Sequence, residues 1–578
     1  MTSIASGESK RRTASAPAIT QERLIQLGLL AILAALLVGP LAILIRAGFA
    51  PPNTLPFESW SITTANFRAI ILDPTTPGLL ANTLIYAAGS MGLGVAIATA
   101  LAWLTERTDM PGRALIRTAL FTWMAVPPVI IGFGWILLIN PGNGALNAFA
   151  RWAFGASAPF TIYSMWALIF ITALSVAPTA HVMISGLLQN MDPQLEQAGK
   201  VHGATSVQIA RRITLPLLTP GILSIGVFML VAVVQAFDLP VIVGLTARIP
   251  VLSTRIFLLS SPDTGVPNYG LAAAFGTLLL VAAALLMWLY FRIVGAGEKY
   301  RVVSGRAFRT RRIALGRWRL FASTGSLLLL LVMISPVLIL LWTSFLPFYR
   351  LPSIDGLSQL TLSTYRRVLA LPSASGAILN TVPLVTVSAT IVMLLSSLIA
   401  WISVRARGAL SRALETLSFL PAAVPPIVMA MAILLMYLRT PLYGALALLI
   451  IGHITIYIAF GTRTMSSALV QIHKELTDAA LVSGASLFAV FRRIIVPLVW
   501  PQILNGFLWV VAHSARDLTI PLMLMTASNM VVASLAWTMW DIPDLPAAAA
   551  LSMLLVAVLL VVVAPLQLVI ARATDRRA

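Results

Sequence analysis

The chain has 578 residues, of which 59% are hydrophobic and 10% are charged, and its net charge is +20. Soluble domains carry roughly 25% charged residues, so this composition excludes an ordinary soluble enzyme and a disordered chain. The mean hydropathy is +0.93. Continuous apolar runs such as Leu27–Leu44 and Leu551–Val563 favour a polytopic membrane protein whose spans are helices.

The basic excess and the missing cysteines narrow the chemistry further. Loops on the cytoplasmic side of membrane proteins collect Lys and Arg, so the charge does not require a nucleic-acid partner. The chain contains no Cys and only five scattered His. We therefore expect no disulfide, no Cys nucleophile, and no metal site built from thiolates or clustered His. No clustered set of acids and bases is visible in or near the predicted spans, so we also expect no catalytic residue.

The predicted elements follow in chain order. A polar tail (1–23) precedes six spans in a first half (24–294), a basic linker (295–317), six spans in a second half (318–572) and a short tail (573–578). The predicted spans are 24–45, 78–104, 115–139, 163–188, 217–244, 268–294, 320–345, 377–403, 414–438, 443–466, 499–527 and 547–571. We therefore predict an all-α protein with about twelve transmembrane helices.

Charge predicts how the spans are oriented. With the N-terminus in the cytoplasm, most Lys and Arg fall on the cytoplasmic side, including the dense run in the linker 295–317. Both termini are then cytoplasmic, because the number of spans is even.

The two halves repeat one another in ungapped blocks. Four blocks share an offset of 298: Phe67 with Tyr365, Asn82-Thr83 with Asn380-Thr381, Ala102-Trp103 with Ala400-Trp401, and Pro127-Pro128 with Pro425-Pro426. Later blocks share an offset of 281: Gly203 with Gly484, Arg211-Arg212 with Arg492-Arg493, Pro216-Leu217 with Pro497-Leu498, and Pro220 with Pro501. With six spans each, the halves insert the same way up, as a parallel repeat around a central path. The proline pairs are expected to kink the third span of each half.

A polar segment follows the fourth span of each half. The copies are LEQAGKVHGATSVQIARRITLP (195–216) and LTDAALVSGASLFAVFRRIIVP (476–497). Each predicts two short helices in an L, with the bend at a glycine and the end at a proline. In the first copy, Asp192 and Ser206 are expected to cap these helices. In the second copy, Gly484 and Ser486 repeat this layout. Small residues at Ala198, Gly199, Ala479 and Ala480 would let another protein approach closely.

These two segments resemble the EAA loop of binding-protein-dependent ABC importer permeases. The resemblance covers nearly the whole chain and is closest to the fused permeases of iron(III), thiamine and 2-aminoethylphosphonate importers. It implies a type I importer fold and loops that dock on an ATP-hydrolysing subunit. Residues carried over by motif position are Glu196, Ala198, Gly203 and Pro216 in the first loop, and Ala479, Gly484 and Pro497 in the second. The second loop has Thr477 at the glutamate position, so that either Asp478 takes its role or the contact is weaker.

The energy source is expected to lie on other chains. No G-x-x-x-x-G-K-[ST] phosphate loop occurs in the sequence. The resemblance implies two copies of an ABC ATPase subunit that bind ATP and Mg, and a periplasmic or extracellular substrate-binding protein. It places the chain in the bacterial inner membrane, surrounded by the lipid bilayer, with no cofactor of its own.

Charged residues inside the predicted spans are candidates for the translocation path. Asp238 lies in the fifth span, and Arg516 and Asp517 lie in the eleventh. Asp238 and Asp517 align in the repeat if two residues are gapped. Either the carboxylates line a path for a cation, or they satisfy polar groups at broken helix ends, with Arg516 neutralising Asp517.

The sequence leaves the substrate open. Iron(III) is the first choice from the resemblance, with 2-aminoethylphosphonate and thiamine as alternatives in the same role. A secondary transporter driven by an ion gradient is the alternative class, because such proteins also show two parallel six-span halves. The repeated polar L favours the importer over the secondary transporter.

Overall fold

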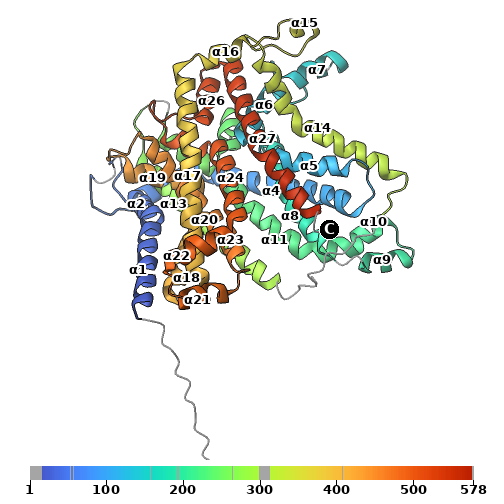
Figure 1. The fold of residues 1–578 in the computed structure, drawn as a ribbon. Helices are drawn as coiled ribbons and strands as arrows, with labels where there is room; N and C mark the ends of the chain where they lie inside the picture. The colour runs from blue at the N-terminus through green and yellow to red at the C-terminus, as the bar shows by residue number, and fades with distance from the viewer. Residues whose placement is uncertain are drawn as a thin grey trace, which may run out of the picture. The chain divides into compact units, whose positions relative to one another are not determined.

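A computed structural model describes residues 16–52, 54–55, 58–155, 158–191, 194–262, 265–297, 313–405 and 408–575. Regular structure in these ranges is helical, apart from one bridge pairing between Thr108 and Ile313. The prediction of an all-α chain is confirmed (Figure 1).

Helices of very different lengths succeed one another along the chain. The first part of the chain forms α1 (Ala16–Leu33), η1 (Ala34–Val38), α2 (Gly39–Gly48), α3 (Ala65–Leu72), α4 (Thr76–Arg107), α5 (Arg113–Trp123), α6 (Pro128–Ile139), α7 (Ala145–Phe154), α8 (Met165–Gln189), α9 (Gln194–Val201), α10 (Ser206–Ile209), η2 (Ala210–Thr214), α11 (Leu215–Val234), η3 (Pro240–Gly244), α12 (Leu252–Ser260) and α13 (Tyr269–Gly297). The second part forms α14 (Trp318–Ser344), α15 (Ile354–Leu357), α16 (Ser363–Leu369), α17 (Pro372–Arg405), α18 (Ala409–Phe419), η5 (Leu420–Ala423), α19 (Pro426–Tyr437), α20 (Leu446–Leu469), α21 (Lys474–Val482), α22 (Leu487–Val490), η6 (Phe491–Ile495), α23 (Val496–Leu498), α24 (Trp500–Arg516), α25 (Thr519–Leu524), α26 (Val532–Asp541) and α27 (Leu545–Asp575).

Eight helical runs among the described residues are long and apolar enough to cross a bilayer, or up to 11 if each of three bent pairs counts as one span. The eight runs are Arg23–Gly48, Thr76–Arg107, Met165–Gln189, Ala210–Val234, Tyr269–Ile293, Trp318–Ser344, Pro372–Arg405 and Leu446–Leu469. The twelfth predicted span, 547–571, falls within α27. The chain is a multi-pass membrane protein, and the count of twelve stays a prediction.

The third predicted span of the first half, 115–139, is not one straight helix. α5 and α6 meet at Pro127-Pro128 with an angle of 107°. Pro127 is extended, with φ −61° and ψ 135°, because the ring of a following proline disfavours the helical region. Pro128 then begins α6, where its missing N–H leaves no helical bond unmade. Pro425 has the same extended backbone, with φ −57° and ψ 134°. The expected kink is therefore a full break.

The fifth span of each predicted half is also interrupted. α11 ends at Val234, and η3 begins only at Pro240. In the second half, α24 ends at Arg516 and α25 begins at Thr519. The spans predicted over 217–244 and 499–527 are therefore broken helices, as the helix-end interpretation of Asp238 and Asp517 requires. The polar residues of the candidate path lie at these two breaks.

By its contacts the chain forms two compact units. The smaller unit comprises residues 1–39, 390–422 and 457–507, and the larger unit comprises residues 40–389, 423–456 and 508–578. The division into two predicted halves with tails and a linker stays a prediction.

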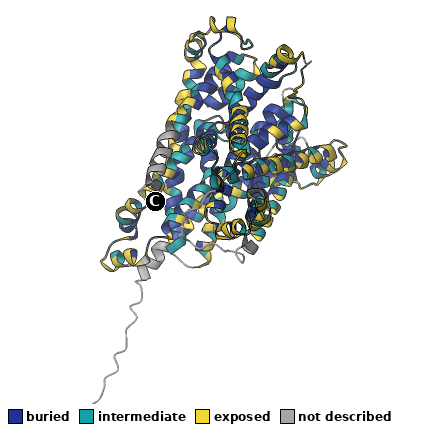
Figure 2. Cartoon of the chain, turned by 90° about the vertical axis from the view of Figure 1, so that its right-hand side faces the viewer, coloured by how far each residue is buried: buried dark blue, intermediate teal, exposed yellow. Residues whose placement is uncertain are grey.

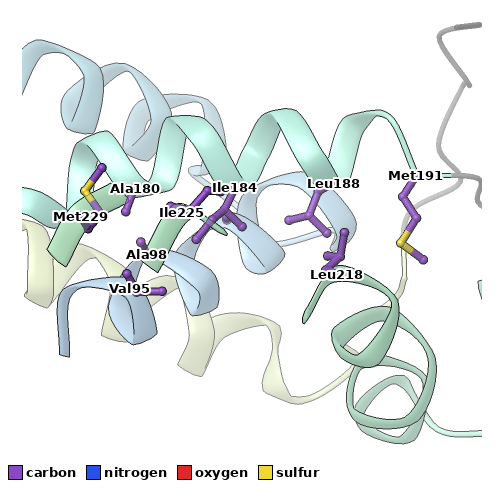
Figure 3. Packing of buried hydrophobic residues seen from close by; sticks show 10 residues of the cluster. Val95, Ala98, Ala180, Ile184, Leu188, Met191, Leu218, Ile225 and Met229 are labelled. Atoms are coloured by element: carbon purple, nitrogen blue, oxygen red, sulfur yellow. The ribbon is translucent and has the colours of Figure 1, made fainter. Parts of the chain in front are cut away.

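The core of the larger unit includes a cluster where α4, α8 and α11 pack together (Figure 3). The buried members of this cluster include Val95 and Ala98 of α4, Ile184 of α8 and Ile225 of α11. Alanines on α4 and α8 let the helices approach closely, which is the usual mode of packing in membranes. Figure 2 shows that exposed and buried positions alternate along the same helices. We attribute the exposed apolar positions to contact with lipid.

The smaller unit joins the N-terminal helix to later helices. Gln26 of α1 donates a hydrogen bond to Ser411 of α18 over 3.2 Å, and both side chains are buried. Trp401 of α17 packs against Phe491 of η6, with ring centroids 5.2 Å apart.

The repeat predicted from the sequence is visible in matched hydrogen bonds of the larger unit. The hydroxyl of Thr83 accepts from the backbone N–H of Leu252 at the start of α12, over 3.0 Å. The hydroxyl of Thr381 accepts from the N–H of Val532 at the start of α26, also over 3.0 Å. Asn82 and Asn380 donate beside them, to the carbonyls of Pro250 and Met530. The repeated Asn-Thr pair thus caps the same helix in each half.

Candidate functional site

The first candidate element is the pair of L-shaped segments. Gly203 and Gly484 have φ of +81° and +86°, which confirms the predicted bends. The N–H of Ala204 bonds to the carbonyl of Gly199, and the N–H of Ala485 bonds to that of Ala480, each over 3.1 Å. A hydrogen bond to the carbonyl five residues earlier is typical of a helix that ends at a residue in the left-handed conformation. Glycine adopts this conformation without steric strain because it has no Cβ. α9 and α21 therefore end in the same way.

The predicted caps differ in outcome. The hydroxyl of Ser486 accepts from the N–H of Ala489 over 3.2 Å and so begins α22. Asp192 lies outside the described residues. The prediction for Ser206 is wrong, because α10 begins at Ser206 itself, and the hydroxyl of the preceding Thr205 accepts from the N–H of Gln208 over 3.3 Å.

The prediction that Pro216 ends the second short helix is wrong. The helix continues from α10 through η2 into α11, with Pro216 in the first turn of α11. η2 is a π-helical turn, with hydrogen bonds between residues five apart, and it lies directly before α11. Pro216 is tolerated there because it stands in the first turn of α11, where a missing N–H removes little helical bonding. In the second loop, η6 and α23 carry the helix past Pro497, and α23 ends only at Leu498. Both prolines therefore lie inside helical runs.

Glu196 is buried in an ion pair with Arg107, the last residue of α4. The distance between Arg107 Nη1 and Glu196 Oε2 is 3.3 Å, and the side chains are only 1% and 5% exposed. Thr214 of η2 donates to Glu196 Oε1 over 2.6 Å. Arg107 Nη2 also donates to the carbonyls of Leu188 and Met191, over 2.7 and 3.0 Å. We call these five residues the Arg107 cluster.

The Arg107 cluster changes the interpretation of Glu196. Its carboxylate faces its own chain, and it holds α9 against α4 and η2. The expectation that Glu196 takes part in coupling stays a prediction. The contacts support a role in positioning α9 rather than in touching a partner.

The second loop has a looser version of the same pair. Arg405 ends α17 as Arg107 ends α4, and the two arginines share the offset of 298. Arg405 Nη2 lies 3.6 Å from Asp478 Oδ1, and Asp478 is 62% exposed. Asp478 thus pairs with the arginine that ends α17, as Glu196 pairs with the arginine that ends α4. Thr477, at the glutamate position of the second loop, is buried. Sequence reasoning missed both arginines, although the repeat offset pairs them.

Each loop helix also presents a small apolar surface. Ala198 and Ala479 are exposed at matching positions. Val201 and Val482, also matched, are 85% and 86% exposed. The expectation that Gly199 is kept small for another protein is not supported, because a Cβ there would lie 2.6 Å from the Ile213 side chain. The alanine and the last valine are therefore exposed apolar positions that the two helices share.

The second candidate element is the polar cluster at the two helix breaks. Thr519 donates to Asp238 Oδ1 over 3.1 Å. These residues differ by 281, as do Pro240 and Pro521. Thr519, not Asp517, is therefore the repeat partner of Asp238, and the gapped alignment is corrected. Because equivalent residues of a two-fold repeat can touch only close to the axis, this contact marks where the repeats meet.

The other predicted path residues lie beside this contact. Asp517 accepts from the N–H of Ile520 over 3.2 Å, so it caps the start of α25. His453 Nε2 lies 3.5 Å from Asp517 Oδ2. Arg516 donates to the carbonyl of Met124 at the end of α5. The helix-end role thus has direct support for Asp517, and the path role of all three residues stays a prediction.

Gln235 belongs to the same region and was missed. It is the repeat partner of Arg516 at the offset of 281. Its Nε2 is buried and has no hydrogen-bond acceptor within the described part of the chain. The repeat offset could have pointed to it. No group of three or more His, Cys, Asp or Glu that could hold a metal occurs among the described residues.

Comparison with known proteins agrees with the two-fold repeat. A model of the family described as binding-protein-dependent transport system inner membrane component matches residues 90–296 and 392–577. The putative ferric transport system permease protein FbpB 1 of Haemophilus influenzae is 24% identical over 459 residues, which are 76% of this chain and 68% of that protein. The ferric transport system permease protein FbpB of Actinobacillus pleuropneumoniae is 24% identical over 463 residues, covering 76% of this chain and 63% of that protein. The Fe(3+)-transport system permease protein FbpB 2 of Haemophilus influenzae is 23% identical over 479 residues, which are 82% of this chain and 85% of that protein. The resemblance inferred from the two loops is confirmed.

Proposed function

The chain belongs to the family of binding-protein-dependent transport system inner membrane components, and on that premise we propose that it is the permease subunit of an ATP-driven importer for iron(III). The observation that carries the transport role is the pair of matched L-shaped segments. Their bends, terminal hydrogen bonds and exposed valines agree in both halves. A chain with one energy source per half needs such matched contacts.

We propose that each L docks on one copy of an ABC ATPase, so that two copies bind this chain. ATP and Mg would bind to those subunits. Exposed apolar side chains such as Val201 and Val482 gain free energy when a partner covers them. The alanines beside them let the partner's backbone approach closely. This chain would transmit the movement and make or break no covalent bond.

For orientation we propose that both termini and both L segments face the cytoplasm. The support is the excess of Lys and Arg in the segments on that side of the predicted topology. The substrate-binding protein would then deliver its cargo to the opposite face.

The proposed substrate rests on the similarity to ferric transport permeases. The carboxylates of Asp238 and Asp517 at the helix breaks suit the passage of a cation. No three-ligand site occurs among the described residues. We therefore expect a path that passes the metal, or a complex of it, without retaining it.

Uptake of radioactive iron(III) citrate tests the proposal in cells that lack the chromosomal copy of this chain. Expression of the wild-type chain should restore uptake. The matched control is a chain with Gly203→Val and Gly484→Val at equal abundance in the membrane. Restored uptake of 2-aminoethylphosphonate or thiamine, with iron uptake unchanged, would refute iron(III) and keep the permease role.

A further inference from the structure

A cavity of about 200 Å³ lies between α4, α8 and the start of α11. Its lining includes Trp103, Ile184, Leu188, Ala210, Arg211, Thr214 and Leu218. Figure 3 labels three of them, Ile184 and Leu188 on α8 and Leu218 on α11. An apolar cavity of roughly 150 Å³ can hold a group the size of benzene. This cavity therefore has room for part of a hydrocarbon chain.

The second repeat indicates what belongs in this place. Ala210 corresponds to Phe491, and Trp103 corresponds to Trp401. The ring of Phe491 packs on Trp401 with a centroid separation of 5.2 Å. In the first repeat, the matching position beside the tryptophan carries only the methyl group of Ala210. An apolar group from outside the chain can take the place that the phenylalanine ring takes in the second repeat.

The surroundings favour a lipid as that group. α4, α8 and the run Ala210–Val234 are all candidate membrane spans, so that bilayer lipid is the nearest source of hydrocarbon. Arg211 lies in the lining, and Arg212 follows it, and both are exposed. Leu215 and Leu217 are exposed on the next turn. Basic side chains beside exposed leucines are typical of the level of lipid phosphates.

We propose that this cavity binds one acyl chain of an anionic phospholipid, whose phosphate pairs with Arg211. The site shares Leu188 and Thr214 with the Arg107 cluster. The bound chain would pack against the residues whose polar atoms hold α9. An anionic lipid would therefore stiffen the first L segment and leave the second unaffected. Binding of the lipid requires only that the chain lies in a membrane, and it does not rest on the proposed transport of iron(III).

Photolabelling tests the site directly. The full-length chain is placed in phosphatidylcholine nanodiscs that contain a phosphatidylglycerol with a diazirine on its acyl chain, and labelled peptides are mapped. Label should appear at Ile184–Leu188 and Leu215–Leu218. Ala210→Phe, which copies the second repeat, should lower this label by about tenfold, equivalent to excluding about two methylene groups. Label on α13 and α14 should stay the same, which shows that the variant is folded and inserted.

Matched variants test the two parts of the proposal. Arg211→Gln should lower the phosphatidylglycerol label several-fold, whereas Arg492→Gln, at the equivalent position, should not. Phe491→Ala should create new label next to Trp401. Undiminished label in both Ala210→Phe and the milder Ala210→Ile would overturn the acyl-chain site. Equal label from phosphatidylcholine and phosphatidylglycerol probes would overturn the assignment of Arg211 to an anionic headgroup. The labelling pattern is expected to be the same whether or not the chain imports iron(III), so that the lipid site and the proposed substrate are tested separately.

Discussion

Replacing Glu196 by Gln tests whether the buried ion pair with Arg107 holds α9 in place. The side chain keeps an oxygen that can accept from Thr214, so the main loss is the charge opposite Arg107. Removing one partner of a buried pair leaves the other charge uncompensated, at about 3–5 kcal/mol. Arg107 keeps its bonds to two backbone carbonyls, so we expect the low end, about 3 kcal/mol. That is a factor of roughly 100 in the equilibrium between docked and undocked α9.

Asp478→Asn is the matched control, because the chain contains a looser copy of the same pair. Asp478 is 62% exposed and lies 3.6 Å from Arg405. Ion pairs this exposed contribute about 0–1 kcal/mol, so the equilibrium between docked and undocked α21 should change by less than a factor of about 5. Gln and Asn each remove one charge without changing the size of the side chain appreciably.

Hydrogen exchange of the purified chain measures both variants in one experiment. Glu196→Gln should raise exchange of the α9 amides strongly, and Asp478→Asn should raise that of α21 slightly. Substrate uptake should follow the same order. Equal effects of the two variants, or unchanged protection of α9 in Glu196→Gln, would refute the reasoning from burial.

Four further predictions concern other parts of the molecule. If the path hypothesis holds, Asp238→Asn should impair uptake at normal abundance and change stability by about 1 kcal/mol or less, because Asn still accepts from Thr519; loss of abundance would instead indicate a structural role. Gly203→Val should reduce uptake through backbone strain of about 1–2 kcal/mol, whereas Gly203→Asn should retain most of it, because a Cβ at Gly203 meets no neighbour; equal defects would contradict this. The hydrogen bonds from Arg367 hold the pKa of Asp544 below its ordinary value, so this pair stabilises the folded chain above pH ~4, and the stabilisation is lost as the pH falls further. At neutral pH the melting temperature of Asp544→Asn should therefore be lower than that of the wild type, by an amount equivalent to about 0.5 kcal/mol for this partly exposed pair. In acid the two melting temperatures should converge. A topology reporter at Asp355 should report the outside, and a cytoplasmic signal there would overturn the proposed orientation.

The sequence by itself determined the class of fold, the repeat and the two L-shaped segments. These features depend on local chemistry. Long apolar runs with few charges can satisfy their backbone in lipid only as helices. A glycine between two short amphipathic helices allows the left-handed backbone seen at Gly203 and Gly484. Matched offsets, read along the chain, predicted the Asn-Thr pairs that now cap α12 and α26.

Tertiary structure decided which of these residues meet. Glu196 looked like a surface residue of a motif, but packing brings it to Arg107, 89 positions earlier in the chain. A proline after two arginines looked like the end of a helix, but the π-helical turn before Pro216 carries the helix past it into a membrane span. The offset of 281 pairs Asp238 with Thr519, but only the structure shows that these two side chains are hydrogen-bonded to one another. Local pattern fixes the backbone of a few residues at a time, whereas these pairings depend on how helices distant in sequence pack, and a single sequence carries no direct signal of that packing.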